Sequence, residues 1–223
     1  MEHLEQPPAE IIRLLTPFLS TERMARLADV ISRRTDTVVT VIEGLINFGN
    51  VSAVMRSAEA LGFHKFHIIE GDAAFKNSQR TSQGADKWLD VSKWSTPAAC
   101  IPTLQAQGYN VVATHLDETA VNIDEIDFTK PTALVFGNEA DGVSDALLEL
   151  ADQRCIIPMA GFVQSFNISV AAAVALYHAY HDRMSRQGFH GDLGEAAQEA
   201  LLASYCYRSV NHADDILLKI REG

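Results

Sequence analysis

Two polar side chains, Ser165 and Asn167, directly precede an alanine-rich segment that is typical of a long helix. The short apolar segment 155–157 comes before them, and a loop that contains Pro158 and Gly161 joins the two parts. Backbone N–H groups at a helix N-terminus have no partner within the helix, and the helix dipole is positive there. This end of a helix therefore favours electron-rich ligand atoms. The pattern predicts a strand, a ligand-binding loop and a helix, in that order.

A second polar loop of the same type occupies residues 136–142, after the apolar run 132–135. It carries Gly137, Asn138 and Glu139. Glycine permits sharp bends and a close approach of the backbone to a ligand. Glu139 is either an exposed loop carboxylate or a group that acts on a bound ligand, and the pattern alone leaves both alternatives open.

A third polar loop leads to Asn50, after the β-branched run 37–43, and Arg56 follows in the next predicted helix. Asparagine is a common N-cap residue, so Asn50 can cap the helix predicted over residues 51–61. It can also hold a ligand or Arg56 in place, and the two roles are compatible. Arg56 is either an ordinary surface arginine or part of the site.

Apolar and β-branched runs alternate along the chain with segments of helical spacing, which predicts an α/β fold with a parallel sheet and right-handed crossovers. We expect strands over residues 37–43, 66–69, 109–114, 132–136 and 155–157, and helices over residues 24–31, 51–61, 97–107, 143–151 and 168–183. In such sheets ligands bind outside the carboxyl ends of the strands. The three polar loops all follow strands, so we expect them to meet at that edge.

The 223 residues suit one α/β domain with short additions at both ends. We expect residues 1–36 to form an N-terminal helical extension, residues 37–187 the α/β domain, and residues 188–223 a C-terminal helical extension. The three cysteines are widely spaced and are expected to be reduced thiols of a cytoplasmic protein. Because no apolar run approaches membrane-spanning length, no membrane partner is expected.

The formal net charge of −11 argues against a protein that coats nucleic acid without specificity. Acidic residues concentrate between Val111 and Cys155, whereas most basic residues lie elsewhere. This distribution is compatible with a local basic face on an acidic protein and equally with an ordinary solvated surface.

Several familiar signatures are missing from the sequence. It contains no glycine-rich dinucleotide loop after the first strand, no phosphate-binding loop and no Gly-x-Ser-x-Gly motif. His178 and His181 have the spacing of a metal-binding pair, but no third ligand is placed to complete the site. No metal is therefore expected.

Three segments resemble, in order and at plausible spacing, the three motifs of the SpoU branch of the SPOUT RNA 2′-O-ribose methyltransferases, namely residues 50–62, 136–142 and 157–171. Residues 84–88, 113–116 and 126–132, and the arginine-bearing helix at residues 22–34, are similar to the TrmH subfamily. The ordered set of three motifs is far more specific than any one of them.

The resemblance implies methylation of the 2′-hydroxyl of the D-loop guanosine of tRNA, at position 18, with S-adenosyl-L-methionine as the methyl donor. It also implies an α/β/α SPOUT fold whose C-terminal part is tied in a deep trefoil knot, and a homodimer with the active site near the interface. Two alternatives stay open: methylation of ribosomal or another RNA, and a non-catalytic knotted RNA-binding protein.

The roles of the family's residues carry over to matching positions of this chain. The resemblance implies catalytic roles for Arg56, Asn50, Glu139, Asn167 and Ser165. It implies cofactor contacts, largely through the backbone, at Thr114, Gly137, Asn138, Ile157, Met159 and Phe166, the last in place of the usual leucine. RNA phosphates are expected to contact Arg23, Arg26, Arg33, Arg34 and Arg80. Because a guanidinium group stays protonated in proteins, Arg56 is expected to act by positioning and charge stabilisation, or by a phosphate-coupled proton transfer.

Overall fold

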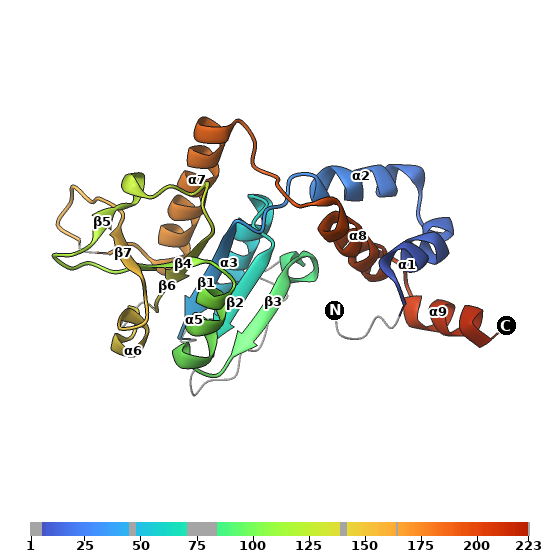
Figure 1. Ribbon diagram of the computed structural model, residues 1–223, viewed down its shortest axis with the longest axis horizontal. Helices are drawn as coiled ribbons and strands as arrows, with labels where there is room; N and C mark the ends of the chain where they lie inside the picture. Colours follow the sequence, from blue (N-terminus) through green and yellow to red (C-terminus); the bar gives the residue numbers. More distant parts are fainter. Residues whose placement is uncertain (1–5, 45–47, 71–83, 139–141, 164, 223) are drawn as a thin grey trace. The chain divides into compact units, whose positions relative to one another are not determined.

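The computed structural model describes residues 6–44, 48–70, 84–138, 142–163 and 165–222 (Figure 1). The chain divides into two compact units, of which the first combines residues 1–34 with residues 191–223 and the second comprises residues 35–190. Two residues predicted to belong to the site, Arg80 and Glu139, lie outside the described residues.

The second unit is built on a seven-stranded sheet with the strand order β3-β2-β1-β6-β4-β7-β5. Every strand pair in this sheet is parallel, so the predicted parallel α/β sheet is confirmed. The strands are β1 Val38–Glu43, β2 Lys65–Ile69, β3 Asp90–Trp94, β4 Asn110–Thr114, β5 Val121–Asn122, β6 Thr132–Phe136 and β7 Gln153–Ile156.

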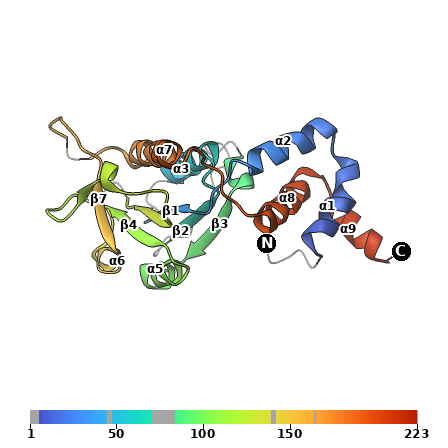
Figure 2. The ribbon, with the colours of Figure 1, turned by 45° about the horizontal axis from the view of Figure 1, so that its top comes forward.

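Helices cover both faces of this sheet and make a three-layer arrangement (Figures 1 and 2). Val38 and Ile42 of β1 join the core formed with α3 and α7, whereas Val39 and Val41 join the core formed with α5 and α6. A central parallel strand is buried on both faces, which explains its continuous β-branched run. The helices are α3 Phe48–Ala60, α5 Pro97–Ala106, α6 Asp145–Leu148 and α7 Ile168–Gln187, with single 3₁₀ turns η2 Ala85–Trp88 and η3 Ile123–Glu125.

The edge strand β3 was not expected from the sequence. Its side chains are mostly half-buried, and Lys93 forms an exposed ion pair with Glu70 at 3.0 Å. Such polar edge strands lack the apolar run of a central strand, and charge on an edge discourages pairing with other chains. α6 is also shorter than the predicted helix over residues 143–151.

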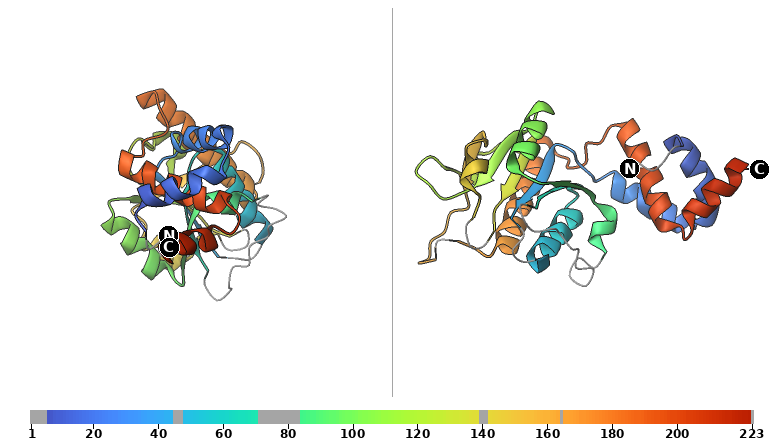
Figure 3. Two further views of the ribbon diagram at one scale, coloured as in Figure 1. Left: turned by 90° about the vertical axis from the view of Figure 1, so that its right-hand side faces the viewer. Right: turned by 90° about the horizontal axis from the view of Figure 1, so that it is seen from below.

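The first unit is helical and contains both terminal segments (Figure 3). Its elements are α1 Pro8–Leu15, η1 Thr16–Phe18, α2 Thr21–Ile31, α8 Glu195–Ser209 and α9 Ala213–Glu222. α1 and α2 both pack against α8. Ser20 caps α2, because its Oγ accepts a hydrogen bond from Arg23 N at 3.2 Å. Two separate terminal extensions were expected from the sequence, whereas the two terminal segments form one helical unit together.

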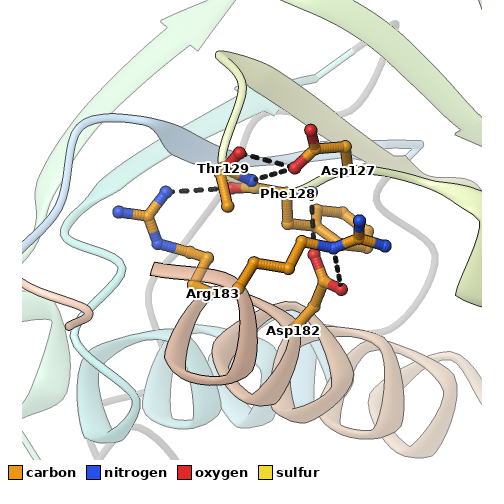
Figure 4. A network of polar contacts seen from close by, with 6 residues as sticks. Asp127, Phe128, Thr129, Asp182 and Arg183 are labelled. Carbon is orange, nitrogen blue, oxygen red and sulfur yellow. Dashed lines mark hydrogen bonds and ion pairs between the residues drawn. The ribbon is translucent and has the colours of Figure 1, made fainter. Parts of the chain in front are cut away.

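A buried arginine anchors the carboxyl-terminal half of α7 (Figure 4). Arg183 is fully buried, and its guanidinium donates to the carbonyl oxygens of Phe128 at 2.9 Å and His190 at 3.0 Å. The neighbouring Asp182 accepts a hydrogen bond from Phe128 N at 3.1 Å and another from Arg186 Nε at 2.6 Å. α7 is thus fixed to the segment that leads into β6.

Candidate active site

Four neighbouring strands of the sheet, β1, β6, β4 and β7, end at one edge because they are all parallel. Most of the residues predicted to belong to the site follow these ends. α3 with Asn50 and Arg56 follows β1, Thr114 is the last residue of β4, Gly137 and Asn138 follow β6, and the segment 157–167 follows β7. The topology therefore gathers residues from distant parts of the sequence along a single sheet edge.

After β6, Asn138 and Gly142 lie next to each other as an antiparallel pair. Asn138 and Gly142 exchange two backbone hydrogen bonds, each of 3.0 Å. A Cβ atom on Gly137 would lie only 1.9 Å from the carbonyl carbon of Gly142, so only glycine fits at position 137. Gly142 also adopts a left-handed φ of 70°, which favours glycine. The expectation that glycines permit bends and close approach here is met at Gly137 and Gly142.

Asn167 is the N-cap of α7. Its side-chain Oδ1 accepts hydrogen bonds from Ser169 N at 2.9 Å and from Ser169 Oγ at 2.5 Å. Asn167 is exposed, and because the cap uses its oxygen, its amide NH₂ is the group that can donate to a ligand. The structural role and the predicted catalytic role thus belong to different atoms of one side chain.

This division of labour gives a specific prediction. Asn167→Asp keeps an oxygen acceptor for the cap but removes the NH₂ donor, so the thermal midpoint of unfolding should stay within a few degrees of the unmodified protein. Methyl transfer to RNA should fall by about 10- to 100-fold, the effect of losing one good hydrogen bond. Steady-state kinetics and thermal unfolding of Asn167→Asp and Asn167→Ala, measured side by side, test this. If Asn167→Asp were as active as the unmodified protein, Asn167 would have no role in the reaction.

The segment between β7 and α7 carries exposed apolar side chains next to the predicted cofactor contacts. Phe162 is fully exposed and Phe166 is 41% exposed, while Ile157 and Met159 are half-buried. Ser165 is exposed as well. A Cβ atom built on Gly161 would have no neighbour within 4 Å, so this loop leaves open space beside it.

Thr114 and Cys155 contribute little side-chain chemistry to this edge. The hydroxyl of Thr114 donates to Val135 O at 3.0 Å and so ties β4 to β6, which leaves the backbone of Thr114 for a ligand. Cys155 is fully buried in β7, and this burial raises the pKa of its thiol to about 12. A thiol that stays protonated near neutral pH is not a nucleophile.

Arg56 and Asn50 both lie in α3. The helix begins at Phe48, so Asn50 is part of its first turn and not the cap of a helix that starts at residue 51. Arg56 is exposed and forms no hydrogen bond or ion pair with any other residue that the structure describes. Its guanidinium group is therefore available to an anionic ligand.

The arginines predicted to contact RNA belong to the first unit, apart from Arg80. Arg23, Arg26 and Arg33 are exposed, and the last two share the carboxylate of Asp29, Arg26 at 2.9 Å. Arg34 is only 1% exposed and is not available to a phosphate in this conformation. The helical pattern placed Arg34 on the charged side of α2, but the helix ends before it, at Ile31.

Glu43, the last residue of β1, was not predicted to support the site. It is buried, and its carboxylate accepts hydrogen bonds from Ser144 N at 2.8 Å and from Ser144 Oγ at 2.5 Å. A glutamate that ends a buried strand, directly before Gly44, was the available signal. Buried carboxylates are rare unless they are hydrogen-bonded.

The described residues include neither a helix suited to cross a membrane nor a cluster of metal ligands. Over the residues that the structure describes, no helix has the length and apolar character needed to cross a membrane. The same residues include no cluster of three or more histidine, cysteine, aspartate or glutamate side chains that could hold a metal ion.

Comparison with known proteins agrees with this geometry. The profile of the SpoU rRNA Methylase family matches residues 37–177. The tRNA (guanosine(18)-2'-O)-methyltransferase of Escherichia coli K12 is 35% identical over 187 residues, which are 82% of this chain and 82% of the relative.

Solved structures show the same similarity. The crystal structure of the TrmH/SpoU tRNA modifying enzyme of A. aeolicus has a TM-score of 0.78 at 32% identity and covers 85% of this chain and 98% of that chain. The SpoU methyltransferase AviRb from Streptomyces viridochromogenes, in complex with the cofactor AdoMet, has a TM-score of 0.62 at 33% identity and covers 70% of this chain and 62% of that chain. The protein therefore belongs to the SpoU rRNA methylase family, as its three motifs suggested.

Proposed function

We propose that this protein methylates the 2′-hydroxyl of guanosine 18 in the D-loop of tRNA, with S-adenosylmethionine as the methyl donor. The observation that carries the proposal is the gathering of all three motifs at one sheet edge, in a chain that is similar over 82% of its length to a tRNA (guanosine(18)-2'-O)-methyltransferase. The protein is proposed to act in the cytoplasm, which agrees with three buried cysteines that form no disulfide.

Mass spectrometry of ribose-methylated nucleosides tests the proposal. Separate pools of unmodified tRNA and ribosomal RNA are incubated with the protein and S-adenosylmethionine and then digested. We expect 2′-O-methylguanosine in the tRNA pool, mapped to position 18. Methylation of ribosomal RNA alone would overturn the choice of substrate, and absence of methylation in both pools would favour a non-catalytic RNA-binding protein.

The residues at the edge fit the cofactor. Phe166 and Met159 offer partly exposed apolar surface for an adenine ring, and the open space at Gly161 admits a ligand against the backbone. The tight bend at Gly137 and Asn138 presents backbone groups on the neighbouring strand. When bound, S-adenosylmethionine supplies an activated methyl group on a sulfonium.

The side chains of this chain then have to bind and align the ribose. Arg56, which has no partner among the described residues, binds a phosphate beside the target ribose and holds the 2′-oxygen in line. The amide NH₂ of Asn167 donates to the ribose, and Ser165 and Asn50 line the same edge. Glu139 is proposed to act beside Arg56 as in the family. Such alignment accounts for much of the rate in a reaction with an activated donor.

Exposed arginines of the first unit are proposed to bind the phosphates of tRNA. Arg23, Arg26 and Arg33 are the described candidates.

We expect the logarithm of tRNA affinity to fall with the logarithm of salt concentration by about 0.7 per phosphate contacted. Arg23→Gln should reduce this slope by about one contact. Lys130→Gln, which removes an exposed cation before β6, should leave the slope unchanged; a slope equal in all three proteins would contradict this binding face.

We also propose that the protein is a homodimer and that its chain is tied in a trefoil knot. α7 exposes Val170, Val174, Tyr177 and Met184 at spacings that place them on one helix face. A row of large exposed apolar side chains is typical of a protein–protein contact. The knot is proposed from the resemblance to the SpoU family alone. Light scattering at micromolar concentration measures the mass of the assembly.

A further inference from the structure

Glu43 and Ser144 form a buried polar contact between the end of β1 and the segment that follows the β6 loop. One carboxylate oxygen accepts from Ser144 N at 2.8 Å, and the other accepts from Ser144 Oγ at 2.5 Å. Ser144 Oγ in turn accepts from Leu147 N at 3.2 Å and caps α6. Hydrogen bonds to an ionised acceptor are among the strongest in proteins. The contact therefore holds together the end of β1, Ser144 after the β6 loop, and the start of α6.

The next residue, Gly44, contacts the other end of the same loop. It adopts a left-handed φ of 78°, and a Cβ atom at this position would lie 2.9 Å from Asn138 Nδ2. Asn138 and Gly142 close the loop by their paired backbone hydrogen bonds. Two consecutive residues at the end of β1 thus lie against both ends of this loop. Gly44 lies against Asn138 at its start, and Glu43 binds Ser144 just after its end.

We propose that Glu43 is a positioning residue for the cofactor-binding loop. Its carboxylate holds Ser144, two residues after Gly142, against the end of β1, the strand that leads into α3 and Arg56. Glu43 does not react itself, because it is buried and both its oxygens are bound to Ser144. The inference rests on the proposed function, since it assumes that this loop binds S-adenosylmethionine.

The experiment compares Glu43→Gln, Ser144→Ala and the double variant. A glutamine keeps the size of the side chain but removes its negative charge and places an NH₂ group opposite Ser144, so the two charge-assisted hydrogen bonds are weakened or lost. We expect the Kd for S-adenosylmethionine, measured by calorimetry, to rise about 10-fold in each single variant. The Kd of the double variant should be lower than the product of the two single effects predicts, because both changes act on the hydrogen bond between Ser144 Oγ and Glu43.

Asp152→Asn is the matched control. Asp152 accepts from Val111 N at 2.8 Å and from Gln105 Nε2 at 3.1 Å, so it also joins a backbone and a side-chain donor, but at the amino ends of β4 and β7. Its replacement should lower the thermal midpoint of unfolding without changing the Kd. If Glu43→Gln behaved like Asp152→Asn, with a lower midpoint and an unchanged Kd, Glu43 would be merely structural and the proposal would be overturned.

Hydrogen–deuterium exchange of residues 142–148 supplies a readout that needs no cofactor. Exchange at the Ser144 amide should be faster in Glu43→Gln than in the unmodified protein, whereas Asp152→Asn should not change it. A protein that bound no S-adenosylmethionine but showed this faster exchange would refute the proposed function while keeping the tie between Glu43 and the loop. Unchanged exchange would refute the tie itself. Should Glu43→Gln fail to fold, Ser144→Ala still removes the hydrogen bond that Ser144 Oγ donates to Glu43, while the bond from the backbone N of residue 144 remains.

Discussion

Arg56→Ala should lower the rate of methyl transfer by about 100- to 1,000-fold, the typical effect of removing one group that stabilises charge in an active site. S-adenosylmethionine should still bind with its normal Kd, because the predicted cofactor contacts lie in the loops after β4, β6 and β7 and not in α3. The exposed guanidinium has no partner among the described residues, so its loss should leave the fold intact. Single-turnover kinetics with labelled S-adenosylmethionine and calorimetry measure the two effects separately.

Lys130→Ala is the control for this prediction. Lys130 is an exposed cation just before the amino end of β6, at the opposite edge of the sheet, and its loss should not change the rate. Arg56→Lys keeps the charge but loses the planar pair of donors, so it should recover only part of the activity. Full activity of Arg56→Ala would exclude a role in the reaction.

Arg183→Ala should reduce the free energy of unfolding by about 3 kcal/mol. The change leaves the carbonyl oxygens of Phe128 and His190 without their charged donor and opens a cavity where a fully buried side chain was. Denaturant unfolding followed by circular dichroism measures the loss.

Arg186→Ala, one helical turn closer to the end of α7, provides the comparison. Its ion pair with Asp182 involves a side chain that is 46% exposed, so we expect a loss of only about 0.5 kcal/mol. Similar losses in the two variants would show that the buried hydrogen bonds of Arg183 contribute little to stability.

The central elements of the fold could be predicted because their sequence signals are local. β1 and β6 are short runs of apolar and β-branched residues, and β6 was predicted with its observed bounds. α7 follows from its alanine-rich sequence and the asparagine before it, and it ends near Gly188, which adopts the left-handed conformation. Signals of this kind do not depend on partners elsewhere in the chain.

Features that depend on distant partners could not be predicted. The pairing of α1 with α8 joins the two ends of the chain, and no local pattern encodes it. The burial of Arg34 and Arg183 contradicts the usual preference of arginine for the surface. Glu43 was overlooked for the same reason, because its partner Ser144 lies far away in sequence. At the site, the motif residues could be recognised by their types and spacing. The contact between Glu43 and Ser144 behind them could not.

The pairing of β1 with β6 has a consequence for synthesis of the chain. β1 lies in the middle of the sheet between β2 and β6. The ribosome synthesises β6 only after most of the second unit. Until β6 leaves the ribosome, one side of β1 stays open, and the entropy of closing so long a loop opposes the pairing. A nascent chain that stops before Thr132 should therefore be prone to self-association and unable to bind ligand, so maturation of this protein is expected to be slow and to benefit from chaperones.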